Sequence, residues 1–224
     1  MNRLAIFDCD GTLVDNEGTI LAAVEETFAI HGLTVPPPKV RRGVIGLGLF
    51  EAMARLAPDQ DEDVQRQLTE TYKSCFFRAR QEGRVEEPLF DGVLDLIDDL
   101  ERDGWVLAVA TGKSDRGLKH CLDGHGIHAR FVSLQTADRH PSKPHPSMVE
   151  QALADAGASP RTCFVVGDTA YDMSMARAAG AGALGAGWGY HDDAELLAGG
   201  AQLIAEAPHA VMDLLPQLME RMDG

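Results

Sequence analysis

The chain has 224 residues, 45% of them hydrophobic, enough for one substantial core and a smaller module. Its formal net charge of −15 argues against binding to a phosphate backbone, so nucleic acid is not an expected partner. No apolar run approaches the roughly 20 residues of a membrane span, and no signal peptide precedes the first strand pattern. Four cysteines without metal-binding spacing predict reduced, buried thiols, so we expect a cytoplasmic protein.

The first predicted element is a buried strand that ends in two carboxylates. The apolar run 4–7 is typical of a strand covered on both faces, and Asp8, Cys9, Asp10 and Gly11 follow it directly. Burying an unpaired charge is costly, so two acids at this point suggest that they act on a ligand. An ordinary Asp-Gly turn is the alternative for this segment taken alone.

A helical block follows the first strand. Apolar residues at helical spacing predict one helix that starts after Asp15 and ends at His31-Gly32, a second after residues 46–48, and a third that closes near Gly83. No strand pattern interrupts residues 15–83, so we expect this block to be a small helical domain.

From residue 84 onward, helices and strands alternate. A helix with Leu94, Ile97 and Leu100 that ends at Gly104 is expected before the second strand. This alternation predicts an α/β fold with a doubly wound parallel sheet, formed by residues 1–14 and 84–224, into which residues 15–83 are inserted. The later strands are expected at residues 105–110, 131–134, 163–166, 183–186 and 201–205, with a last helix near 209–222.

Polar residues follow the first four strands near the point where each strand ends. In an open α/β sheet, ligands bind in the crevice beyond the carboxyl ends of the strands. Loops far apart in the sequence can therefore build one site. The residues are Asp8 and Asp10, Thr111 and Gly112, Lys143, and Asp168 and Asp172.

These residue types suit metal-assisted phosphoryl transfer. Asp8 and Asp168 offer the hard oxygen ligands that Mg²⁺ prefers, and without a cation the clustered acids would repel one another. Thr111 and Lys143 can bind phosphoryl oxygens, which leaves Asp10 to move protons. Each element alone has a commoner explanation, such as a helix cap or a solvated lysine, so the prediction rests on their joint occurrence.

The four segments together resemble the signatures of the haloacid dehalogenase-like (HAD) phosphohydrolase superfamily. They are residues 8–15 (Asp-Cys-Asp-Gly-Thr-Leu-Val-Asp), Thr111-Gly112, Lys143 and residues 167–172 (Gly-Asp-Thr-Ala-Tyr-Asp). The resemblance covers the whole chain and implies a Rossmann-like core with a small α-helical cap. Residues 185–191 look like the phosphoglycolate-phosphatase branch, although that branch often has Thr-Asn where this chain has Thr-Gly.

The resemblance also implies roles for individual residues. Asp8 would be the nucleophile that forms an aspartyl-phosphate, and Asp10 the general acid/base, whose backbone carbonyl also ligates Mg²⁺. Asp168 would complete the protein ligands of the metal. Phosphate would be bound by Thr111, Gly112 and Lys143, with Thr12 and Asp172 in supporting positions.

Four further residues carry weaker expectations. Arg42 and Gly46 lie where a cap would face the core, so contact with substrate and a plain surface position are both open. For His140 and His145, which flank Lys143, a solvated or capping role is favoured over catalysis.

The expected function is hydrolysis of a small phosphomonoester such as phosphoglycolate, by a monomer or homodimer whose partner is a small phosphorylated metabolite. A phosphosugar mutase of the same superfamily remains open, because it differs only in passing the phosphate to sugar instead of water. A phospho-receiver signalling domain also uses an aspartate, a threonine and a lysine on a parallel sheet. Such a receiver domain needs no helical cap and no acid at the position of Asp10.

Overall fold

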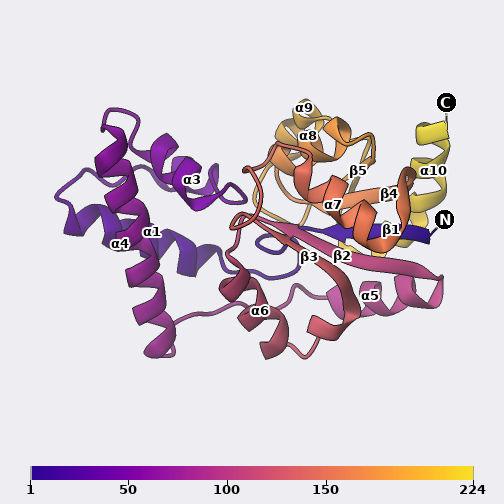
Figure 1. Ribbon diagram of the computed structural model, residues 1–224, viewed down its shortest axis with the longest axis horizontal. Coiled ribbons are helices and arrows are strands. Elements are labelled where there is room, and N and C mark those ends of the chain that lie inside the picture. Colours follow the sequence, from indigo (N-terminus) through magenta and orange to yellow (C-terminus); the bar gives the residue numbers. More distant parts are fainter. Residues whose placement is uncertain (1, 224) are drawn as a thin grey trace.

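The computed structural model describes residues 2–223, which form two lobes (Figure 1). One lobe is a parallel sheet with helices on both faces, and the other consists of helices. The strands are β1 (Asn2–Phe7), β2 (Trp105–Thr111), β3 (Phe131–Thr136), β4 (Ala158–Gly167), β5 (Gly182–Ala186) and β6 (Leu203–Ala205). Their order is β3-β2-β1-β4-β5-β6 with every pair parallel, which confirms the predicted doubly wound α/β fold.

Two apolar layers cover the sheet, and β1 contributes to both. Ala5 and Phe7 pack toward α5, α6 and α10, whereas Leu4 and Ile6 pack toward α7, α8 and α9. This is why the run 4–7 is apolar at every position. The helices of this lobe are α5 (Val93–Arg102), α6 (Asp115–Gly124), α7 (Ser147–Ala156), α8 (Ala170–Ala178), α9 (Asp193–Gly199) and α10 (Val211–Asp223), with short 3₁₀ turns at His128–Arg130 and Pro208–Ala210.

Two details were not predicted. The expected helix with Ile97 and Leu100 is α5, but Leu94 is 45% exposed, because the buried face of this helix is formed by Val93, Leu96, Ile97 and Leu100. Strand β4 begins at Ala158, five residues earlier than predicted. The prediction missed these residues because the first half of the strand is polar and partly exposed.

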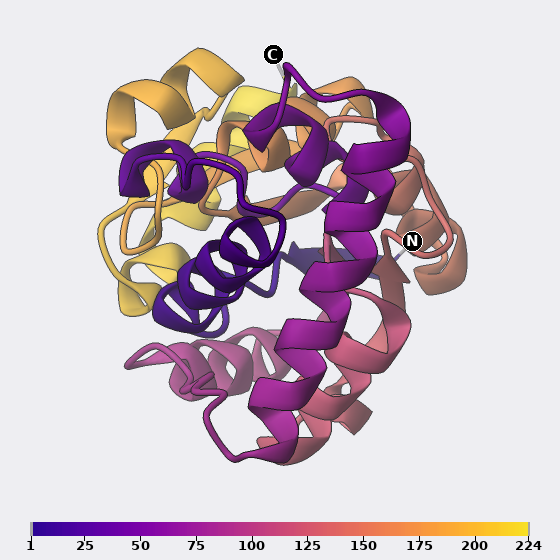
Figure 2. The same ribbon diagram turned by 90° about the vertical axis from the view of Figure 1, so that its left-hand side faces the viewer.

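The second lobe has its own core and contains no strand among residues 15–83. Val24, Phe28, Met53 and Leu68 are buried within it. Figure 2 views the molecule from this lobe and shows α1 and α4 in front of the sheet. The helices are α1 (Glu17–Ile30), α2 (Pro38–Arg42), α3 (Leu49–Leu56) and α4 (Glu62–Gln81). We call this lobe the cap; the boundaries at 14/15 and 83/84 stay a prediction.

The two linkers between the lobes run side by side. The backbone N–H of Asp15 donates to the Pro88 carbonyl (2.8 Å), and that of Phe90 donates to the Leu13 carbonyl (3.0 Å). The cap is thus attached through a narrow pair of linkers, which suits movement of one lobe against the other. None of the helices between residues 2 and 223 is long and apolar enough to cross a membrane.

Candidate active site

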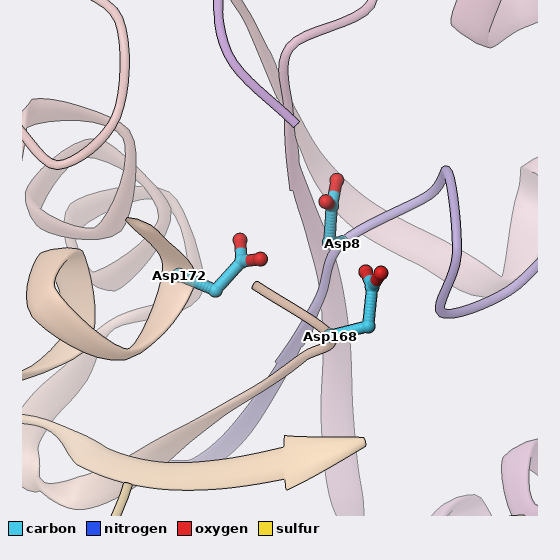
Figure 3. A group of neighbouring side chains, drawn as sticks. All are labelled: Asp8, Asp168 and Asp172. Carbon is cyan, nitrogen blue, oxygen red and sulfur yellow. The ribbon is translucent and has the colours of Figure 1, made fainter. Parts of the chain in front are cut away.

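Three carboxylates meet at the carboxyl edge of the sheet (Figure 3). Asp8 follows β1, Asp168 follows β4, and Asp172 lies in the first turn of α8. One oxygen from each lies within 4.8 Å of the others, and all three residues are fully buried. They converge because β1 and β4 are adjacent parallel strands, as the sequence led us to expect.

A single buried lysine pairs with this cluster. Lys143 Nζ lies 2.8 Å from Asp8 Oδ2 and 2.6 Å from Asp172 Oδ1, and its side chain is wholly inaccessible. Burial alone would lower the pKa of Lys143, but Asp172 and Asp8 outweigh burial and raise that pKa, so the ammonium stays charged. One positive charge against three carboxylates leaves an excess of negative charge.

The negative excess shows in the carboxyl groups themselves. Burial raises the pKa of Asp8 to about 7; Lys143 opposes this shift, and Asp172 and Asp10 reinforce it. Burial, then Asp8 and Asp172, raise the pKa of Asp168 well above its usual value. A divalent cation would relieve this repulsion, and carboxylate oxygens are what Mg²⁺ prefers. The donor set therefore fits Mg²⁺, with Asp8 and Asp168 as side-chain ligands.

The Asp168 carboxylate is held from two sides. Thr12 Oγ1 donates to Asp168 Oδ1 (3.0 Å), and the Tyr190 backbone N–H donates to Oδ2 (3.0 Å). The backbones of Gly11 and Gly189 lie so close to the Asp168 side chain that a Cβ at either position would overlap it. Thr12 and the segment 185–191 thus both contact the Asp168 side chain, and the supporting role of Thr12 stays a prediction.

Asp172 belongs to a helix cap and also pairs with Lys143. Its backbone N–H donates to Thr169 Oγ1 and its Oδ2 accepts from the Thr169 N–H, which forms a capping box at the start of α8. Its other oxygen, Oδ1, faces Lys143. The helix cap therefore fixes the carboxylate that holds the lysine.

The carboxylate of Asp10 has partners of its own outside the three-acid cluster. Asp10 Oδ1 lies 2.8 Å from Lys113 Nζ and accepts a 2.5 Å hydrogen bond from Asn16 Nδ2. Lys113 also pairs with Glu87 (2.7 Å). Sequence reasoning missed these three partners. Lys113 could have been found because it directly follows Thr111-Gly112, whereas Asn16 and Glu87 are brought together only by the paired linkers.

The tip of the cap covers the site. The carbonyl oxygens of Gly46 and Leu47 lie against Gly112, where a Cβ would overlap both of them. Gly46 has a φ of +92°, and a Cβ built on it would lie 3.7 Å from Asp8 Oδ2. Thr111, the last residue of β2, is fully buried close by. A glycine is thus required at position 112 because the backbone of the cap meets it there, and glycine is favoured at position 46 because its φ is positive.

Arg42 lies differently from Gly46. Its side chain is 44% exposed, and its Nε pairs with Glu17 at the start of α1. Contact between Arg42 and a substrate, one of the two positions left open above, stays a prediction.

Three hydrogen bonds hold the cap against the core. The Tyr171 hydroxyl donates to the Gly43 carbonyl (2.8 Å) and accepts from Arg55 Nη1 (2.7 Å), while the Gly48 N–H donates to Ser142 Oγ (2.7 Å). Tyr171 belongs to the fourth signature and Ser142 precedes Lys143, so the cap is docked on segments that also supply site residues.

The two histidines near Lys143 have structural partners. The His140 ring bridges Gln135 Oε1 (2.8 Å) on β3 and Ser147 Oγ (2.7 Å) on α7. His145 Nδ1 accepts from the Ser147 N–H (3.2 Å) at the start of α7. These contacts fit the capping role favoured for them and fasten both ends of the Lys143 loop.

Comparison with known proteins identifies the class. The model of the haloacid dehalogenase-like hydrolase family matches residues 3–180, and the chain belongs to this family. It is 35% identical over 229 residues to "Probable phosphatase IndB" of Dickeya dadantii, with 96% of each chain covered. It is 33% identical over 210 residues to a phosphoglycolate phosphatase of Xylella fastidiosa, covering 92% of this chain and 90% of that one.

Solved structures agree on the fold. A β-phosphoglucomutase of Clostridium difficile matches with a TM-score of 0.81 at 15% identity, covering 99% of this chain and 98% of that one. At this identity the likeness shows the fold alone. The family resemblance drawn from the four signatures is confirmed, and the chain is a phosphatase of the HAD type.

Proposed function

We propose that the protein is a Mg²⁺-dependent phosphatase that hydrolyses a small phosphomonoester through a phosphorylated Asp8. The observation that carries the proposal is the fully buried Asp8 carboxylate, 2.8 Å from Lys143 Nζ and grouped with Asp168 and Asp172. A carboxylate held beside a fixed positive charge at a ligand-binding edge is suited to attack phosphorus. Bound Mg²⁺ would add electrostatic stabilisation of the transferring phosphoryl group.

In the first step, an Asp8 oxygen attacks the phosphorus and the bond to the leaving alkoxide breaks. Lys143 and Thr111 hold the phosphoryl oxygens as charge develops on them. Asp10 gives its proton to the leaving oxygen, which departs as an alcohol. In the second step, water attacks the phosphorus, Asp10 takes a proton from that water, and Asp8 is regenerated with release of phosphate.

The cap tip over Asp8 supports a small substrate. Reacting atoms need to approach to about 3–3.5 Å, and the Gly46 backbone occupies the space beside Asp8. The cap must therefore open to admit the ester and close behind it to exclude bulk water. A compact alkyl ester such as 2-phosphoglycolate, the substrate in the name of the Xylella relative, fits this requirement.

The setting of the enzyme is also proposed. Cys9, Cys75, Cys121 and Cys163 are all buried free thiols, which supports a reducing compartment such as the cytoplasm. The net charge of −15 supports a small phosphorylated metabolite as the partner instead of a nucleic acid. A monomer or homodimer is the proposed assembly.

The test is a phosphate-release assay with Mg²⁺ over a panel of small phosphomonoesters, among them 2-phosphoglycolate and several sugar phosphates. Wild type should release phosphate from at least one of them. Asp8→Asn, which is nearly isosteric but not nucleophilic, should lose at least a thousandfold in kcat and keep its melting temperature. Activity of Asp8→Asn within about tenfold of wild type would remove Asp8 from the nucleophile role.

The same preparation decides between the alternatives. Phosphorus NMR of a hexose phosphate would show a new ester position without free phosphate if the protein were a mutase. A phosphorylated protein that persists for hours without turnover would point to a receiver domain.

A further inference from the structure

A buried ion-pair network outside the four signatures leads from Asp10 to the linkers. Lys113 Nζ lies 2.8 Å from Asp10 Oδ1 and 2.7 Å from Glu87 Oε1. The side chains of Lys113 and Glu87 are only 8% and 9% exposed. Lys113 stands just beyond β2, whereas Glu87 lies in the second linker, so the pair joins the core to the connection that carries the cap.

Two more residues extend the network into the cap. Asn16, in the first linker, is 2% exposed, and its Nδ2 donates to Asp10 Oδ1 (2.5 Å) and to Glu87 Oε1 (3.3 Å). Arg80, in the last turn of α4, pairs with Glu87 Oε2 at 2.6 Å. The network thus contains two acidic and two basic side chains, and Glu87 is contacted from the cap, the core and the first linker.

The charged state of the network follows from its contacts. Burial alone would lower the pKa of Lys113, but Asp10 and Glu87 outweigh it and raise that pKa well above its usual value. Burial alone would raise the pKa of Glu87, but Lys113 and Arg80 outweigh it and lower that pKa. Buried ion pairs of this kind contribute little net stability compared with apolar packing, so they are better evidence for fixed geometry than for stability.

We infer that Lys113 and Glu87 are positioning residues for Asp10. Lys113 fixes the Asp10 carboxylate, and Glu87 couples the contact between Lys113 and Asp10 to the position of the cap. Lys113 contacts the carboxylate directly and Glu87 contacts it only through Lys113 and Asn16. A movement of the cap moves Arg80 and the second linker with it. It therefore weakens or restores the contacts that position the Asp10 carboxylate. Proton transfer is thereby confined to the closed state, in which water is excluded.

This inference rests on the proposed function and adds residues that act through Asp10. A poorly positioned Asp10 carboxylate should slow only those reactions that need a proton from Asp10. An alkyl phosphate has a poor leaving group and needs the proton; p-nitrophenyl phosphate has a good one and barely needs it. The ratio of kcat/KM for the two substrates therefore reports on Asp10, whereas general damage to the site lowers both values together.

The experiment compares Lys113→Met, Lys113→Arg and Glu87→Gln with wild type on an alkyl phosphate from the panel and on p-nitrophenyl phosphate. Lys113→Met should lose roughly ten- to a hundredfold in kcat/KM on the alkyl ester and less than about threefold on the aryl ester. Glu87→Gln should show the same pattern more weakly, and Lys113→Arg should recover part of the loss. Lys119→Met, which breaks an exposed pair with Asp123 on α6, is the matched control and should match wild type.

A second arm covers the case in which Lys113→Met folds poorly. In an Asp10→Asn background, the Lys113 and Glu87 substitutions should cause no further loss on the alkyl ester, because the group that they position is already gone. Equal loss on both esters, or full loss retained in the Asp10→Asn background, would overturn the positioning role while leaving the phosphatase proposal intact. Absence of phosphate release by wild type from every ester would overturn both.

Discussion

Lys143 Nζ lies 2.8 Å from Asp8 Oδ2, and neither side chain is exposed to solvent. The lysine draws the pKa of Asp8 downward, but burial is the larger influence and raises that pKa to about 7. The nucleophile is therefore only partly neutralised by its own lysine. This shortfall of positive charge links the stability of the protein to pH and to metal.

The first prediction concerns stability without metal. The pKa of Asp8 is about 7 in the folded protein, against 3.8 for an aspartate carboxyl in the unfolded chain. The folded state therefore binds more protons than the unfolded state between these two pH values. Stability contributed by this proton is present below about pH 4 and is lost as the pH rises through about 7. Thermal melts in EDTA should show wild type losing more stability than Asp8→Asn between pH 5 and pH 8. An identical fall in both proteins would contradict the prediction.

The second prediction concerns the cation. Chelation with EDTA should abolish phosphate release, and Mg²⁺ should restore it, because Asp8 and Asp168 otherwise repel each other and the incoming phosphate. Mg²⁺ should also raise the melting temperature, more at pH 8 than at pH 5. Ca²⁺ should support activity poorly, since it takes more ligands at longer distances. Full activity after verified removal of metal would disprove the requirement.

The third prediction concerns the docking of the cap on Tyr171. Tyr171→Phe keeps the ring but removes the hydroxyl that bonds Gly43 and Arg55. Bonds of this kind are worth about 0.5–3 kcal/mol, so kcat/KM should fall roughly threefold to a hundredfold, with exchange of cap amide protons becoming faster. Ser74→Ala, which removes an exposed hydroxyl on α4 that donates to the Glu70 carbonyl, is the control and should match wild type. No change in either measurement for Tyr171→Phe would show that this contact does not govern closure.

Much of the fold was predictable because its signals are local. The run 4–7 is apolar on both sides of the strand, and the later strands repeat this pattern between helices. Local spacing alone does not settle which face of a helix is buried. Leu94 has helical spacing to Ile97 yet is largely exposed, because Val93, Leu96, Ile97 and Leu100 form the buried face of α5.

The site was predictable to the extent that it lies on strand ends. Asp8 and Asp168 directly follow β1 and β4, and Thr111 is the last residue of β2. These three strands are neighbours in the sheet, so parallel order alone brings the residues together. Asn16 and Glu87 depend on how the two linkers pair, and no short-range pattern encodes that pairing. No short-range pattern predicts the partners of Tyr171 either, because they belong to the cap.

The last prediction concerns Asp10 and separates hydrolysis from phosphorylation alone. Its two tasks fall in opposite steps: it gives a proton to the leaving alkoxide and then takes one from the attacking water. Asp10→Asn should therefore lower kcat/KM far more for an alkyl phosphate than for p-nitrophenyl phosphate, by about a hundredfold or more against less than tenfold.

With the activated ester, phosphorylation of Asp8 should still proceed in Asp10→Asn while water attack has lost its base. Phosphoenzyme should accumulate, and rapid quench with labelled substrate would trap it as a burst approaching one equivalent per chain. Asp8→Asn/Asp10→Asn is the control and should trap no label, because the nucleophile is absent. Equal slowing of both substrates, with no trapped intermediate, would mean that Asp10 is only a structural residue or a metal ligand. A second acid would then have to supply the proton.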